Sequence, residues 1–210
     1  MRNALAVTVL IALAGTPCFA GKATDLKPTM TQPGKLIVDE SFTGTALGKS
    51  WAVAKGDWQV RDGMVVGKEK ESDKHAAVLA LNHPNRNSII RFSFKLDGAK
   101  LLSLSLNHAK GHLFRVNIGT NGLAVVKDAD KKDPQSKPVP LGKAPGKFEA
   151  GQWYTMLVEI DGTKVAVQTD NGLKLTGNNP GLDVDKTGYR FVTRGESLLV
   201  SELKVWELQP

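Results

Sequence analysis

The chain has 210 residues, with 28 Lys and Arg against 21 Asp and Glu, 41% hydrophobic residues and a single cysteine. This composition is typical of a globular protein and excludes a disordered, collagen-like or disulfide-built chain. The length fits about one domain. The positive charge is dispersed, and its densest run is the pair Lys131-Lys132, which has acidic neighbours. Nucleic-acid binding needs a clustered basic face, so a nucleic-acid partner is not expected.

Residues 1–20 have the pattern of a signal peptide. Arg2 supplies a positive charge, Ala4–Ala14 form a short apolar segment, and Cys18-Phe19-Ala20 precedes a cleavage position before Gly21. The apolar segment is shorter than the roughly 20 residues of a membrane span. We therefore expect no membrane span and an exported protein, located in the periplasm or outside the cell.

Cys18 also allows a second interpretation, in which the protein is anchored by a lipid. This alternative is less favoured, because Pro17 stands where a lipidation site requires a small residue. Cleavage after Ala20 removes the only cysteine, which excludes disulfides and thiolate metal sites from the mature chain. Residues 21–34, which are polar and contain two prolines, are expected to form a flexible lead-in.

From Lys35 onward, apolar and polar residues alternate in short segments, which is typical of half-buried strands. The clearest segments are residues 90–96, 102–107, 112–118 and 153–160. Asn-Gly and Asp-Gly pairs, which favour tight hairpin turns, separate the apolar runs at residues 62–63, 121–122, 161–162 and 171–172. Successive antiparallel strands without an amphipathic helix predict an all-β fold: a two-sheet antiparallel β-sandwich or jelly roll, forming a single domain over residues 35–210.

The segment 127–151 interrupts this pattern with four prolines. Proline cannot donate to a ladder of hydrogen bonds, so the segment is not a central strand. We expect a mobile excursion at the edge of the sheet, either a lid over a site or a passive loop. A boundary between two domains is the disfavoured alternative, because too few strands follow it to form a second sheet.

Several motifs occur in a recognisable order: Asp39–Gly44, then Gly56–Gly67 with the pattern G-D-W-x-V-x-D-G, then Gly151–Tyr154 and Val158–Gly162. This order resembles the concanavalin A-like lectin/glucanase superfamily and, more narrowly, is similar to the secreted 3-keto-disaccharide hydrolase family. The resemblance implies a jelly roll whose concave sheet receives a sugar. It also implies an acidic residue in a central strand, but the matching stretch Gly111–Asn117 contains no acid.

Polar side chains recur on one face of the central strands. Such a face is either simply solvated or a platform on which Asn and Arg bind sugar hydroxyls. The candidate ligand-binding residues are Arg91, Asn107, Arg115, Asn117, Arg190 and Arg194. His108 and His112 are candidates for acid–base catalysis near neutral pH, with Lys110 between them.

No spacing in the sequence nominates the two carboxylates that glycoside hydrolysis usually needs. Three functions stay open: a non-catalytic domain that binds carbohydrate or another extracytoplasmic ligand, an enzyme that cleaves 3-keto-glycosides, and a structural or partner-binding envelope protein. The sequence leaves the ligand and the oligomeric state open.

Metals and cofactors are not expected. Asp128, Asp130 and Asp133 lack the glycine and the final glutamate of a calcium loop, and lysines lie between them. His75 and His83 have no third ligand at a zinc-site spacing. The four tryptophans are expected in the core rather than on a sugar-stacking surface, since each lies beside an apolar strand.

Overall fold

The computed structural model describes residues 21–209, so the expected signal peptide and Cys18 lie outside the described residues. The predicted all-β antiparallel fold is confirmed, and no helix in this part of the chain is long and apolar enough to cross a membrane. The strands are β1 (Pro33–Glu40), β2 (Trp51–Lys55), β3 (Asp57–Arg61), β4 (Met64–Lys68), β5 (Ala77–Leu81), β6 (Ser88–His108), β7 (Gly111–Gly119), β8 (Gly122–Lys127), β9 (Val139–Pro145), β10 (Trp153–Asp161), β11 (Lys164–Thr169), β12 (Lys174–Asn178) and β13 (Gly188–Leu208). Two short 3-10 helices, η1 (Glu71–Asp73) and η2 (Pro180–Leu182), lie in connections.

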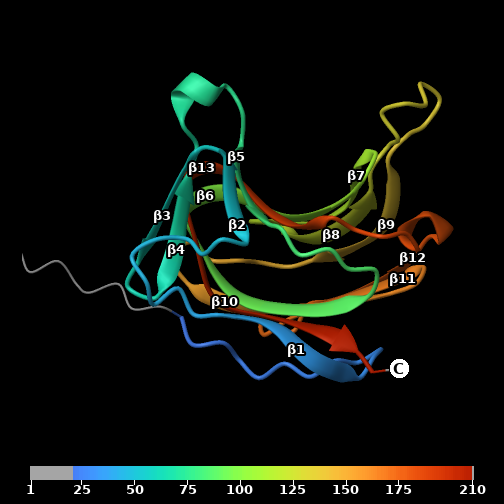
Figure 1. Cartoon of the computed structure of the whole chain (residues 1–210), viewed down its shortest axis with the longest axis horizontal. Helices are drawn as coiled ribbons and strands as arrows, with labels where there is room; N and C mark the ends of the chain where they lie inside the picture. Colours follow the sequence, from blue (N-terminus) through green and yellow to red (C-terminus); the bar gives the residue numbers. More distant parts are fainter. Residues whose placement is uncertain (1–20, 210) are drawn as a thin grey trace, which may run out of the picture.

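Two layers face each other across the core (Figure 1). In the lower layer, β12, β11 and β10 continue into the first half of β6 and the second half of β13, followed by β1. In the upper layer, β9, β8 and β7 continue into the second half of β6 and the first half of β13, followed by β5 and β2. Because β6 and β13 run through both layers, the sandwich is one continuous sheet bent double.

Two glycines lie close together at the bend, one in each long strand. Gly98 in β6 has φ 89° and Gly195 in β13 has φ 93°, a region that side chains disfavour. The register between the two strands shifts between Arg194 and Ser197, as in a β-bulge. A Cβ on Gly195 would lie 2.8 Å from the carbonyl oxygen of Gly98. Both long strands can therefore turn together from one layer into the other.

The core fills the space between the layers with aliphatic and aromatic side chains. Phe92 packs edge-on against Phe191, with ring centroids 5.1 Å apart, and joins the two layers. Trp51 and Trp58 are in the core, as expected. Trp153 and Trp206 are not: they lie on the outer face of the lower layer, beneath Lys95 and Arg91 respectively, at 5.7 and 5.5 Å from ring to cation.

The segment before β1 is held against the sheet and is not the flexible lead-in that its composition suggests. Residues 21–32, here called the N-terminal strap, lie along the outer face of the lower layer (Figure 1, dark blue). The backbone N–H of Thr24 donates to Thr155 Oγ1 at 2.8 Å, and Ser201 Oγ donates to the carbonyl of Gly21 at 3.0 Å. Local composition cannot reveal these partners, because they belong to strands near the other end of the chain.

Glu159 is the main anchor of the N-terminal strap. It is fully buried on β10, and its carboxylate accepts five hydrogen bonds. The backbone N–H groups of Thr29, Met30 and Thr31 donate at 2.7 to 2.8 Å, and the two threonine hydroxyls at 3.0 to 3.1 Å. This buried carboxylate therefore fixes a turn of the strap.

The segment 127–151 contains a strand, which corrects the expectation of a continuous loop. Val139–Pro145 form β9, which pairs with β8 at the edge of the upper layer. Prolines are tolerated there because an edge strand has unpaired positions. Phe148 returns the chain to the core. Only the connection 128–138 rises above the layer (Figure 1).

Candidate functional site

The outer face of the upper layer is curved, with η1 rising above one side and the 128–138 connection above the other (Figure 1). We call it the concave face. Since side chains alternate along each strand, every second residue of the upper layer points to this face. One row of register partners is Ala52, Ala80, Arg190, Ser105, Arg115, Val126 and Pro140. The adjacent row is Lys55, Val78, Val192, Ser103, Asn117, Ala124 and Lys143.

Five of the residues nominated from sequence meet near the middle of this face. Together with the serines between them they form the concave-face polar cluster: Ser103, Ser105, Asn107, His112, Arg115, Asn117 and Arg190. Ser103 Oγ donates to Asn117 Oδ1 at 2.5 Å. His112 Nδ1 lies 3.3 Å from Asn107 Oδ1, and because that oxygen only accepts, Nδ1 carries the proton and Nε2 keeps its lone pair.

Arg115 is held in place by Asp128, a residue whose partner the sequence did not reveal. The Arg115 guanidinium donates two hydrogen bonds to the Asp128 carboxylate, from Nε to Oδ2 at 3.1 Å and from Nη2 to Oδ1. Asp128 follows β8 directly and is only 5% exposed. Such a bidentate pair orients the guanidinium and neutralises its charge.

Arg190 is in a different situation. Its guanidinium makes no hydrogen bond or ion pair within the described residues. Its neighbours on the face are small: Ala80 and Ser105 on the adjacent strands, and Gly188 and Val192 along β13. The residue as a whole is half-buried.

The surroundings of His112 are positively charged. Burial lowers the pKa of His112, and Lys131, Arg115 and Arg190 lower it further, while Asp128 alone opposes them. The imidazole is therefore neutral at pH 7 and able to accept a proton.

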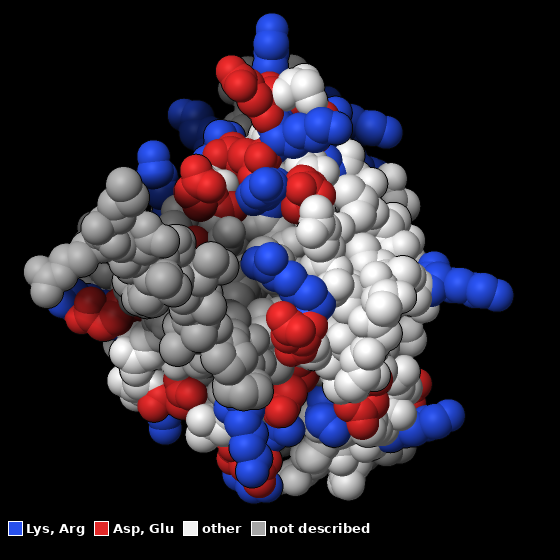
Figure 2. All heavy atoms as spheres, turned by 90° about the vertical axis from the view of Figure 1, so that its left-hand side faces the viewer, with Lys and Arg blue, Asp and Glu red and all other residues white. Residues whose placement is uncertain are grey.

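Three nominated residues lie elsewhere, so the sequence grouping was wrong for them. Arg91 is on the outer face of the lower layer, where its Nη1 donates to Asp25 at 2.7 Å. His108 ends β6 one position past Asn107 and so points away from the concave face. Arg194 lies at the bend, 3.5 Å from Glu69, where acidic and basic side chains alternate around η1 (Figure 2).

The aspartates considered for calcium do not converge. Asp128 binds Arg115, while Asp130 Oδ1 and Asp133 Oδ1 accept the backbone N–H groups of Lys132 and Gln135, both at 2.9 Å. Among residues 21–209, no group of three His, Cys, Asp or Glu side chains could hold a metal ion.

The chemistry available on the concave face is polar and largely without acids. Every Phe, Tyr and Trp of residues 21–209 is in the core except Trp153 and Trp206, so none of these rings faces the concave side. The two rows of register partners contain no carboxylate. The face can bind hydroxyl groups and anions, but it does not offer the two flanking carboxylates of a typical glycosidase.

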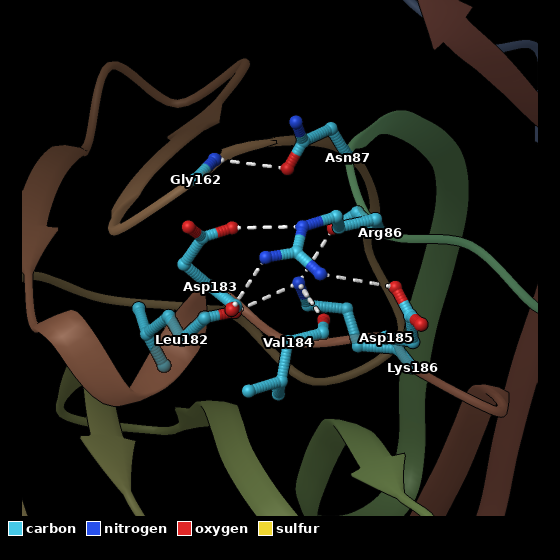
Figure 3. A network of polar contacts seen from close by, with 8 residues as sticks. All are labelled: Arg86, Asn87, Gly162, Leu182, Asp183, Val184, Asp185 and Lys186. Carbon is cyan, nitrogen blue, oxygen red and sulfur yellow. Dashed lines mark hydrogen bonds and ion pairs between the residues drawn. The ribbon is translucent and has the colours of Figure 1, made fainter.

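A second polar network lies away from this face and is structural (Figure 3). Lys186 is 1% exposed, and its Nζ donates to the carbonyl oxygens of Arg86, Leu182 and Val184 at 2.5, 2.9 and 2.9 Å. Arg86 in turn pairs with Asp183 at 3.0 Å and with Asp185 at 3.3 Å. Burial and, secondarily, Arg86 lower the pKa of Lys186 to about 8.

No protein-family model matches the chain, and no curated protein matches it significantly. Solved structures do match its fold. Porphyranase B from Zobellia galactanivorans gives a TM-score of 0.66 at 11% identity, covering 90% of this chain and 100% of that one. The carbohydrate-binding module CBM66 from Bacillus subtilis gives a TM-score of 0.61 at 10% identity, covering 75% of this chain and 96% of that one. SCLam, a non-specific endo-β-1,3(4)-glucanase from family GH16, gives a TM-score of 0.59 at 11% identity, covering 85% of this chain and 95% of that one. The chain therefore has the concanavalin A-like jelly-roll fold that these proteins share.

Proposed function

We propose that this chain is an exported carbohydrate-binding β-sandwich, which holds a glycan on its concave face without hydrolysing it. The observation that carries the proposal is the concave-face polar cluster, in which amide, hydroxyl and guanidinium groups lie side by side on three adjacent strands. The similar folds support it, since they include a carbohydrate-binding module and a glucanase. Export is proposed from the pattern of residues 1–20, and cell fractionation tests it.

Binding rather than cleavage follows from the charges on this face. Asp128, the carboxylate that contacts this cluster through Arg115, is buried and already bound to that guanidinium, so it is not available as a general acid or nucleophile. Asn117 and Ser103, by contrast, can exchange their mutual hydrogen bond for sugar hydroxyls.

Glycan-array screening followed by calorimetry tests this function. Replacing Asn117 by alanine is expected to weaken binding by roughly tenfold, the usual effect of losing about one buried polar contact. Gln59→Ala is the matched control, since Gln59 is exposed on β3, away from the concave face. Absence of binding to every glycan at millimolar concentration would exclude the proposal and leave a structural or partner-binding role, which a pull-down from envelope extract would then address.

One observation favours an enzyme as the second candidate. His112 is neutral at pH 7, with Nε2 unprotonated, and a neutral imidazole can abstract a proton. In a 3-keto-glycoside the carbon next to the keto group is acidic. Transfer of its proton to Nε2 leaves an electron pair that forms a C=C bond as the glycosidic C–O bond breaks, and the departing alkoxide takes up a proton from water.

This candidate predicts turnover of 3-keto-glucosides that is lost in His112→Gln and kept in His83→Gln. Because burial and neighbouring cations lower the pKa of His112 from 6.5, the rate should fall to half its maximum only at a pH below 6.5, where the ring takes up a proton. A rate that declines already around pH 7, or survives in His112→Gln, would exclude His112 as the base.

A further inference from the structure

The concave face lacks the usual means of binding a neutral sugar. Apolar faces of neutral sugars are commonly covered by Phe, Tyr or Trp rings, and within residues 21–209 every such ring is in the core or on the outer face of the lower layer. The floor between the polar residues consists of small side chains such as Ala80, Ser105 and Ala124. Recognition on this floor must therefore come from hydrogen bonds and charge.

The cations on this face exceed the anions. Arg190 and Arg115 flank Ser105 as register partners, which places their Cα atoms about 10 Å apart, at about 4.8 Å per strand. Asp128 neutralises Arg115, whereas Arg190 makes no ion pair within the described residues. Burial is the main cause of the lowered pKa of His112, and Lys131, Arg115 and Arg190 lower it further against one aspartate, in line with this excess of positive charge.

The positive charge continues along the adjacent row. A hollow of about 250 Å³ opens beside Asn117, and its lining includes Lys100 and Lys143 but no acidic residue. Lys143 is the register partner of Ala124, which is in turn the partner of Asn117, so the hollow continues the polar cluster. A ligand of several sugar units could then place one negative group at Arg190 and another near these lysines.

We propose that the glycan is acidic, and that Arg190 binds its carboxylate or sulfate oxygens. This inference rests on the proposed function, because it takes the concave face as the glycan site. A guanidinium surrounded by small side chains can offer two parallel N–H groups to such an anion. A planar uronate carboxylate and a tetrahedral sulfate ester can each present two negatively charged oxygens to a guanidinium, so they are two sources of one chemistry.

Calorimetry with four polymers tests the inference: polygalacturonate, κ-carrageenan, neutral laminarin and neutral dextran. We expect one or both acidic polymers to bind more tightly than the neutral ones, the better one telling whether a carboxylate or a sulfate is recognised. Arg190→Gln should weaken that binding by roughly tenfold to a hundredfold, the range for a lost charge-assisted contact. Arg61→Gln removes the same charge from β3, outside the concave face, and should leave binding unchanged.

The outcomes distinguish a failure of the acidic-glycan inference from a failure of the proposed function. Binding of laminarin or dextran that equals binding of the acidic polymers and survives Arg190→Gln would overturn the inference and leave the proposed function standing. Equal loss of acidic-polymer binding in Arg190→Gln and Arg61→Gln would show attraction by net charge alone and would also overturn it. Binding of polyaspartate as tight as that of the glycans, or no binding of any polymer, would overturn the proposed function itself.

Discussion

Replacing Glu159 by alanine is expected to release the N-terminal strap and to lower the free energy of unfolding by about 2 to 4 kcal/mol. The carboxylate accepts five hydrogen bonds from Thr29, Met30 and Thr31, and no other acceptor replaces it in the alanine variant. Buried donors without a partner are costly, so this part of the strap should leave the sheet and hydrate its N–H groups. The loss is limited to the docking energy of the strap, because the released donors find water.

Urea unfolding measures the loss, and thermolysin digestion with mass spectrometry locates it. Cleavage should appear within residues 22–32, and the amides of Thr29, Met30 and Thr31 should exchange faster. Glu207→Ala, at an exposed position of β13, is the matched control and should behave like the wild type. A Glu159→Ala protein that keeps full stability and an uncleaved strap would show that the contacts with Thr155 and Ser201 suffice to hold it.

The strands could be predicted because alternation is a local property. Leu102, Leu104 and Leu106 all enter the core while Ser103 and Ser105 point to the opposite face, as a period of two requires. The strap could not be predicted in the same way. Its anchor lies about 130 positions away in sequence, and nothing in residues 21–32 distinguishes a polar segment that is held from one that is free.

The candidate site was predictable only in part, for a geometric reason. Alternation identifies Arg91 and Ser105 equally well as outward-pointing residues of one long segment. That segment bends at Gly98, so its two halves belong to different layers and their outward faces lie on opposite sides of the molecule. Arg91 therefore reaches the strap, and only the half after the bend contributes to the concave face.

Two tryptophans that the sequence placed in the core lie outside it. Trp153 pairs in register with Lys95, and Trp206 with Ile89, at outward positions of the lower layer. The strap then covers that face: a Cβ on Gly21 would lie 2.3 Å from the Trp153 ring. An apolar neighbourhood in sequence is thus compatible with a ring outside the core, provided that another segment shelters it.

The network of Lys186 leads to the second large effect (Figure 3). Its ammonium is the shared donor of three carbonyl groups in two connections, 82–87 and 179–187. The connections also meet through the exposed ion pairs of Arg86 with Asp183 and Asp185, a hydrogen bond from Arg86 to the Asp183 carbonyl, and one short β-bridge between Asn85 and Lys186. Within this network, the Lys186 ammonium is the buried donor, and it ties three carbonyl groups together.

Lys186→Met is expected to lower the free energy of unfolding at pH 7 by about 2 to 4 kcal/mol, because a side chain of similar length leaves three carbonyls without their donor.

The pH dependence of the free energy of unfolding gives a second signature of Lys186. The pKa of Lys186 is about 8 in the folded protein, against 10.5 ordinarily, so between these values the unfolded chain binds the extra proton and the wild type gains stability as the pH rises. The difference between wild type and variant should grow by up to about 3 kcal/mol from pH 7 to pH 10.5. Urea unfolding at several pH values measures both effects, with Lys174→Met at an exposed position of β12 as the control. A constant difference across this range would show that the ammonium keeps its ordinary pKa, and no difference at pH 7 would show that the carbonyls find other donors.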